Sequence, residues 1–266
     1  MKVSPVVYQV ANVVAVIVAL IVNTLATALP LNGVPTYRVS DSYPNLFTPP
    51  GYVFSIWSVI YALAIIFMIY QARPSQRKEA YLTQISFVYL LSAVANTSWL
   101  FVFHYSYGVP ELFVFSLVPM AMLLFCLLAI YKRLGIGIKD VPRNQKLAVH
   151  LPISVYLGWI SLAIVANIAS ALNVLIPGIP MATQELWTSL VVVIALVITT
   201  FMVWTRRDFA FGLVIIWASI GIALNRIAIP LIFTASLATA VVVAILILAT
   251  PFLKKTGFIS FYTAAS

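Results

Sequence analysis

Eight long apolar runs, each long enough to cross a bilayer, constrain this chain more than any other feature of its sequence. A transmembrane helix needs about 20 largely apolar residues. Of the 266 residues, 63% are hydrophobic and only 8% are charged, so a water-soluble chain would lack the polar residues to cover its surface. The sequence therefore predicts an all-α integral membrane protein with spans at residues 6–29, 52–71, 81–103, 111–131, 149–172, 185–204, 209–225 and 228–252. We interpret the first run as a retained helix and not as a signal peptide.

The basic residues are divided unevenly between the two sets of loops that these spans define. Short cytoplasmic loops of membrane proteins accumulate Lys and Arg. If the N-terminus is cytoplasmic, only Arg38 and Arg226 lie in outer segments. The other 13 of the 15 basic residues lie in inner segments: Lys2, Arg73, Arg77, Lys78, Lys132, Arg133, Lys139, Arg143, Lys146, Arg206, Arg207, Lys254 and Lys255. We therefore predict that both termini are cytoplasmic, and we attribute the net charge of +9 to loops that face anionic lipids, with no nucleic-acid partner.

The spans contain no pattern of catalytic or metal-binding residues. All six acidic residues lie in loops or at helix ends, and no span contains a lysine that could form a Schiff base. His104 and His150 fall at opposite membrane faces, so they cannot share a metal ion or a haem. Cys126, the single cysteine, lies in an apolar run and is interpreted as packing. We therefore expect no catalytic residue, no metal site and no required cofactor.

Aromatic and polar side chains recur at helical spacing in three of the spans. Residues separated by three, four, seven or eleven positions share one face of a helix. Such faces consist of Phe54, Trp57 and Tyr61 in the second span, Ser92, Asn96, Trp99 and Phe103 in the third, and Tyr156, Trp159, Ala163 and Asn167 in the fifth. Each helix thus presents a tryptophan beside a hydrogen-bonding side chain, and this recurrence favours a common site over three separate packing positions.

Other aromatic and amide residues have simpler interpretations. Trp187 and Trp204 stand at the two ends of the sixth span, which is typical of side chains at the membrane interface. Asn12 and Asn23 in the first span are interpreted as hydrogen-bonding contacts between helices.

Three segments resemble, in order and spacing, motifs of the tryptophan-rich sensory proteins, which are bacterial and archaeal relatives of the mitochondrial translocator protein (the TspO/MBR family). These segments are PPGYVFSIWSVIY at 49–61, ANTSWLFVF at 95–103 and YLGWISLAIVAN at 156–167. The shared features are a proline pair before helix two and tryptophans at matching positions in helices two, three and five. The resemblance covers about residues 1–175 and indicates a long form of the family with extra C-terminal helices.

The resemblance implies a five-helix bundle over residues 1–175 and an appended three-helix membrane segment over residues 176–266. Family members bind porphyrins and other tetrapyrroles, and some bind sterols or synthetic aromatic ligands. The residues that would bind such a ligand here are Pro49, Pro50, Phe54, Trp57, Tyr61, Asn96, Trp99, Phe103, Tyr156, Trp159 and Asn167. The rings would line a pocket for a flat ligand, and the prolines with Gly51 would fix the entry of helix two.

We therefore expect a membrane receptor or carrier for a hydrophobic planar ligand, a porphyrin or another tetrapyrrole. The alternative is a small-solute secondary transporter, which is favoured by a set of polar residues: Asn12, Asn23, Asn96, Asn167, Asn225 and Arg226. Light-dependent porphyrin degradation, proposed for some relatives, needs only a bound pigment beside a tryptophan and stays open. The expected partners are membrane lipids and the ring ligand, with a homodimer as an open alternative.

Arg226 lies in a tight outer turn and has two interpretations. A cation near the membrane is normally paired, hydrated or in contact with headgroups. Arg226 therefore either contacts the outer headgroups or reaches over the mouth of the bundle as a lid, paired with a ligand carboxylate or with Asp41.

Overall fold

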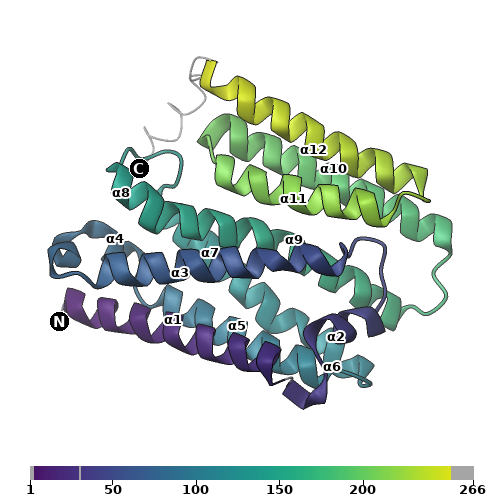
Figure 1. The fold of residues 1–266 in the computed structure, drawn as a ribbon, viewed down its shortest axis with the longest axis horizontal. Coiled ribbons are helices and arrows are strands. Elements are labelled where there is room, and N and C mark those ends of the chain that lie inside the picture. The colour runs from purple at the N-terminus through teal and green to yellow at the C-terminus, as the bar shows by residue number, and fades with distance from the viewer. Residues whose placement is uncertain (1–2, 30, 253–266) are drawn as a thin grey trace.

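The chain forms a bundle of long helices that lie side by side (Figure 1). The computed structural model describes residues 3–29 and 31–252, and within these ranges it contains helices and no strand. Six helical stretches of this described part are long and apolar enough to cross a membrane. These findings confirm the prediction of an all-α integral membrane protein.

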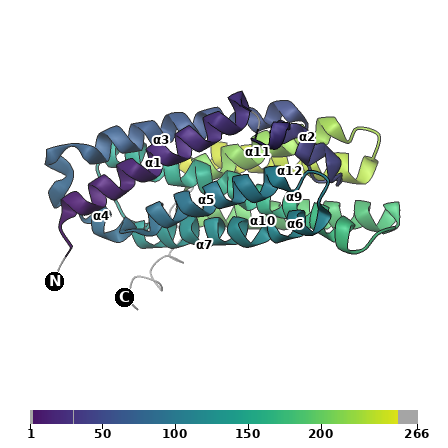
Figure 2. The same cartoon turned by 90° about the horizontal axis from the view of Figure 1, so that it is seen from below.

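Five long helices form the part of the bundle that contains residues 1–175. They are α1 (Pro5–Ala28), α3 (Ile56–Ala72), α5 (Val88–Tyr105), α7 (Leu117–Leu134) and α9 (Leu151–Leu175). α1 packs against α3 and α5, α5 packs against α7, and both α7 and α3 pack against α9. Figure 2 shows these helices running along the same direction of the molecule.

Shorter elements join the five long helices. They are the helices α2 (Thr36–Ser42), α4 (Ala80–Ile85), α6 (Pro110–Phe115) and α8 (Arg143–Gln145), the 3₁₀ turns Leu31–Gly33, Gly51–Ser55 and Pro74–Lys78, and the π-helical turn Lys146–His150. The Gly51–Ser55 turn follows the proline pair and leads directly into α3. Proline has no N–H and a fixed φ, so this entry to the helix is stiff.

The predicted span 81–103 is interrupted by a residue whose backbone is not helical. The run 81–103 consists of α4 and α5, which are separated at Ser86. The φ of Ser86 is 52°, in a region that no right-handed helix uses. The prediction of an unbroken helix through this position was therefore wrong.

Two predicted spans, α5 and α11, are not among the six helical stretches counted above. α5 is rich in polar residues, and α11 is short.

The last three helices pack closely on one another. They are α10 (Met181–Arg206), α11 (Phe209–Asn225) and α12 (Pro230–Ala249), with a final 3₁₀ turn at Thr250–Phe252. α11 also packs against α9, where a methyl group on Gly158 would lie 3.2 Å from the Cβ of Val214. A small residue thus lets the two helices approach closely. The predicted boundary after residue 175 falls in the connection between α9 and α10.

The basic side chains gather at one end of the bundle, which we call the basic end. Ten of them lie in or beside the α3–α4, α7–α9 and α10–α11 connections: Arg73, Arg77, Lys78, Lys132, Arg133, Lys139, Arg143, Lys146, Arg206 and Arg207. Arg38 and Arg226 lie in connections at the opposite end, and Lys2, Lys254 and Lys255 are outside the described residues. That the basic end faces the cytoplasm stays a prediction.

Single cysteines at exposed positions test this orientation. In a Cys126→Ala background, Ser42→Cys should react with an impermeant thiol reagent in intact cells, whereas Ser75→Cys should react only after the cells are opened. Both serines are exposed in the structure, so burial would not account for a difference between them. The reverse labelling pattern would overturn the orientation.

Candidate ligand pocket

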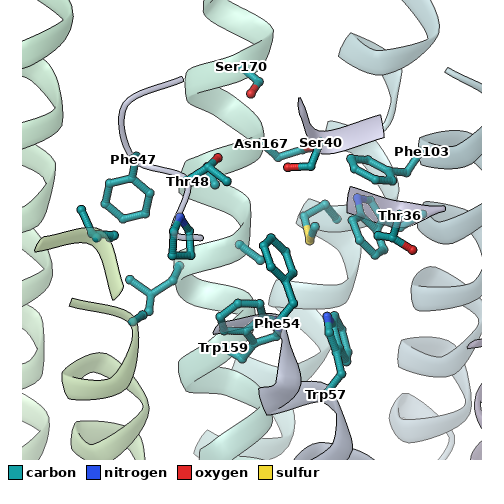
Figure 3. A pocket seen from close by; sticks show the side chains of 18 of the residues that line it. Thr36, Ser40, Phe47, Thr48, Phe54, Trp57, Phe103, Trp159, Asn167 and Ser170 are labelled. Carbon is teal, nitrogen blue, oxygen red and sulfur yellow. The ribbon is translucent and has the colours of Figure 1, made fainter. Parts of the chain in front are cut away.

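Three tryptophans from three helices line one cavity towards the opposite end of the bundle. They are Trp57 of α3, Trp99 of α5 and Trp159 of α9. The Trp159 ring lies edge-on to Phe54 and to Trp57, with centroid distances of 5.7 and 6.2 Å, and Trp99 lies 5.0 Å from Phe103. Figure 3 shows Phe54 beside both Trp57 and Trp159. The three helical faces that the sequence pattern picked out thus meet in the structure.

This cavity, which we call the aromatic pocket, has a volume of about 70 Å³. Its lining is mostly apolar and consists of Thr36, Ser40, Phe47, Thr48, Pro49, Phe54, Trp57, Trp99, Phe103, Phe113, Met120, Trp159, Leu162, Ala163, Ala166, Asn167, Ser170, Ala218 and Ile222. An engineered cavity of roughly 150 Å³ binds benzene. In this conformation the aromatic pocket therefore holds only a small part of a larger ring ligand.

Two indole N–H groups in the aromatic pocket lack a hydrogen-bond partner among the described residues. They belong to Trp99 and Trp159, which are 7% and 3% exposed. A buried donor without a partner costs about 1–3 kcal/mol. Asn167, in contrast, already donates to the Ser116 hydroxyl over 2.9 Å. Both indole N–H groups are therefore buried and without a hydrogen-bond partner in the described part of the chain.

Seven of the eleven predicted ligand-binding residues line the aromatic pocket: Pro49, Phe54, Trp57, Trp99, Phe103, Trp159 and Asn167. Tyr61, Asn96 and Tyr156 instead line a second cavity of about 40 Å³. Trp57 connects the two, because it stacks on Tyr61 at 5.7 Å and lies edge-on to Tyr156 at 6.1 Å. Pro50 lines neither cavity. The binding role of all eleven stays a prediction.

The loop before α3 is organised around Asn45, which the sequence analysis did not single out. Its side-chain oxygen accepts hydrogen bonds from the backbone N–H groups of Phe47 and Thr48, both at 2.8 Å. Its Nδ2 donates to Ser170 of α9 over 2.7 Å. Proline and then asparagine suit the two central positions of a β-turn, and this signal could have identified the residue. The turn places Phe47, Thr48 and Pro49 in the pocket wall.

Comparison with known proteins identifies the family. A family model described as TSPO-like protein matches residues 9–249, which is most of the chain. The chain belongs to the TSPO-like protein family. No curated protein and no solved structure matches it. The family match confirms the resemblance read from the three motifs, and it also covers α10, α11 and α12.

In this TSPO-like protein, α11 forms one wall of the aromatic pocket. Ala218 and Ile222 of α11 line the pocket. Between them, a methyl group on Gly221 would lie only 2.4 Å from the Cγ2 of Val53. Glycine therefore allows α11 to lie directly against the Gly51–Ser55 turn. The segment predicted as an appendage thus contributes to the pocket that the first five helices were expected to form.

Side chains of α11 and of the turn after it donate hydrogen bonds to backbone carbonyls of the loop before α3. These bonds join Trp217 to Val53 (3.0 Å), Asn225 to Thr48 (3.1 Å), and Arg226 to Leu46 (3.0 Å) and Asn45 (2.7 Å). Carbonyls of a loop have no partners from a helix or strand ladder, so these side chains satisfy them. The C-terminal helices therefore hold the pocket loop in place.

Pairing of Arg226 with Asp41 was one of the two lid contacts that the sequence offered. No ion pair joins these two side chains in the described part of the chain, and the guanidinium instead binds the loop carbonyls of Asn45 and Leu46. Burial lowers the pKa of Arg226 from its ordinary value, although a guanidinium remains charged in proteins. A contact between Arg226 and a ligand carboxylate stays a prediction.

The asparagines that favoured the small-solute transporter alternative form hydrogen bonds between helices or between a helix and a loop. The bonds are Asn12 to Gln71 (3.4 Å), Asn23 to Asn96 (2.9 Å), Asn167 to Ser116 (2.9 Å) and Asn225 to Thr48 (3.1 Å). Asn12 and Asn23 thus make the contacts between helices that the sequence predicted. The transporter alternative gains no support from this arrangement.

The structure also places the other tryptophans, the cysteine and the two histidines that were singled out in the sequence. Trp187 and Trp204 are exposed near the two ends of α10, as expected for interfacial rings, and Cys126 is buried. His104 lies 3.1 Å from the Thr36 hydroxyl, whereas His150 lies at the basic end. The described residues include no group of three or more His, Cys, Asp and Glu side chains placed to hold a metal ion.

Proposed function

We propose that this TSPO-like protein is a membrane receptor or carrier that binds a porphyrin or another tetrapyrrole in the aromatic pocket. The observation that carries the proposal is the convergence of Trp57, Trp99 and Trp159, each from a different helix, on one mostly apolar cavity. Ligand pockets typically combine such apolar walls with a few polar groups that fix the orientation of the ligand.

The chemistry of the wall suits a flat conjugated ring. Aromatic contacts contribute about 0.5–1.5 kcal/mol beyond the burial of their area. The unpartnered N–H groups of Trp99 and Trp159 suit acceptors at the edge of the ring, such as carboxylate oxygens. Thr36 and Ser40 add hydroxyl groups to the lining (Figure 3). A tetrapyrrole with acidic side chains offers both the flat ring and the acceptors.

A tetrapyrrole requires a wider pocket than the present conformation. Phe47, which is 2% exposed, lines the aromatic pocket and also a groove of about 200 Å³ between α9 and α10. Displacement of this ring would join the two spaces. The proposal therefore includes a second conformation in which the loop around Phe47 has moved.

Titration of the purified protein with protoporphyrin tests the proposal. A bound porphyrin should quench tryptophan fluorescence, and Trp99→Ala should weaken binding by about 1–3 kcal/mol, the cost of removing an aromatic platform from a stacked ring. Trp204→Ala is the control, because Trp204 is exposed on α10 and lines neither the pocket nor the groove. Absence of binding, or equal losses in both variants, would contradict the assignment of the site.

A further inference from the structure

A larger cavity lies at the basic end, at the other end of the bundle from the aromatic pocket. It has a volume of about 350 Å³ and is formed by the loop after α7, the start of α9 and the α10–α11 connection. Its polar lining residues are Lys139, Asp140, Lys146, His150, Ser154, Arg206, Arg207 and Asp208. We call it the basic cavity.

The backbone around the basic cavity is tightly packed. Gly137 has a φ of 79°, and a methyl group there would lie 2.0 Å from the carbonyl oxygen of Arg206. Arg206 in turn donates to the carbonyl of Ile136 over 3.0 Å. Arg207, at the end of α10, has a φ of 51°, which is uncommon for a residue with a side chain. The loop after α7 and the α10–α11 connection therefore form one fixed wall.

The acidic residues of the basic cavity already have partners. Asp208 accepts hydrogen bonds from the Tyr131 hydroxyl at 2.8 Å and from the N–H of Phe211 at 3.1 Å. Asp140 pairs with Lys146 at 2.8 Å in an exposed position. The lining thus combines four cationic side chains with two engaged carboxylates, which leaves a formal excess of two positive charges. Such a cavity attracts anions.

Two buried polar side chains in the lining lack protein partners. His150 and Ser154 are 6% and 2% exposed. The Nε2 of His150 makes no hydrogen bond with the described residues, and none of them bonds the Ser154 hydroxyl. Buried polar groups are normally hydrogen-bonded, so these two side chains have hydrogen-bonding capacity left for a polar molecule.

We propose that the basic cavity binds a phosphate group, carried either by a phospholipid headgroup or by a soluble phosphate compound. Phosphate oxygens accept charge-assisted hydrogen bonds from lysine and arginine and ordinary ones from serine and neutral histidine. Lys139, Arg206 and Arg207 supply the charge, and His150 and Ser154 supply the buried contacts. Apolar lining residues, Ile136, Leu151 and Phe209, suit the remainder of a lipid or of an organic phosphate. This site is independent of the proposed porphyrin function.

Two binding measurements on the full chain distinguish the two sources of phosphate. The first is a calorimetric titration with inorganic phosphate in neutral detergent. The second is the amount of phosphatidic acid that stays with the protein, read by native mass spectrometry, after reconstitution in phosphatidylcholine nanodiscs that contain phosphatidic acid. The double variant Lys139→Gln with Ser154→Ala should lose about tenfold or more in whichever measurement detects binding.

Arg143→Gln is the matched control, because it removes one positive charge from the same end at an exposed residue outside the cavity lining. It should change binding less than about twofold. If the protein retains phosphatidic acid but does not bind inorganic phosphate, the site is for lipid headgroups. If it binds inorganic phosphate, the site is for soluble phosphates. An equal loss in Arg143→Gln, or no binding in either measurement, overturns the proposal. Ser154→Ala alone, with an unchanged melting temperature, gives the same test if the double variant fails to fold.

Discussion

Gly221→Ala should weaken protoporphyrin binding by roughly a hundredfold and lower the melting temperature of the protein. The new methyl group would lie 2.4 Å from the Cγ2 of Val53, and Val53 is completely buried. A β-branched side chain in a tight core cannot turn away, so the Gly51–Ser55 turn must move. Overpacking of this kind costs about 1–3 kcal/mol, and here the strain falls on the turn that carries Phe54 into the pocket. Fluorescence titration and thermal unfolding would measure the two effects.

Gly51→Ala provides the matched control for this prediction. A methyl group on Gly51 would meet no atom within 4 Å, and its φ lies outside the left-handed region. This variant should therefore bind and unfold like the parent protein. If Gly221→Ala also binds like the parent, close contact between α11 and the Gly51–Ser55 turn is not needed for the site.

Arg226→Gln should weaken the binding of protoporphyrin and of its neutral ester to the same extent, by at least tenfold. The guanidinium donates to the carbonyls of Leu46 and Asn45, and a hydrogen bond to a charged group contributes about 1.5–3 kcal/mol. Loss of both bonds releases the loop that places Phe47 in the pocket wall, whatever the charge of the ligand. Parallel titrations with the two ligands would measure the ratio.

The ratio of the two affinities separates two roles of Arg226. If only protoporphyrin loses affinity, the guanidinium contacts a ligand carboxylate, as the sequence suggested, and the anchoring role is wrong. Arg38→Gln is the control, because Arg38 is an exposed arginine at the same end of the bundle. It should leave both affinities unchanged.

The positions that could be predicted from the sequence are those set by helix periodicity. Trp57, Trp99 and Trp159 occur on polar-aromatic faces, and helices that turn such faces inward bring them together. The same periodicity could not show that residues on one helical face line two different cavities. Tyr61 and Tyr156 lie nearer the basic end of their helices than Trp57 and Trp159 do, and the structure places them at a different cavity.

The contributions that could not be predicted depend on contacts between distant segments. Asn45 bonds to Ser170, and Gly221 packs on Val53, over separations that no local pattern records. The interruption at Ser86 was also missed, because serine within an apolar run is compatible with a helix and only the backbone angle shows the break. Hydropathy therefore located the spans but not the irregular positions within them.

The participation of α11 in the pocket wall has a consequence for how the site depends on protein density in the bilayer. A wall supplied by a second subunit would separate as that density falls, whereas a wall tethered within one chain is held at a fixed, high effective concentration. Ala218, Gly221 and Ile222 are joined to the rest of the pocket by the polypeptide itself. This wall of the pocket therefore stays in place at any density of the protein in the bilayer.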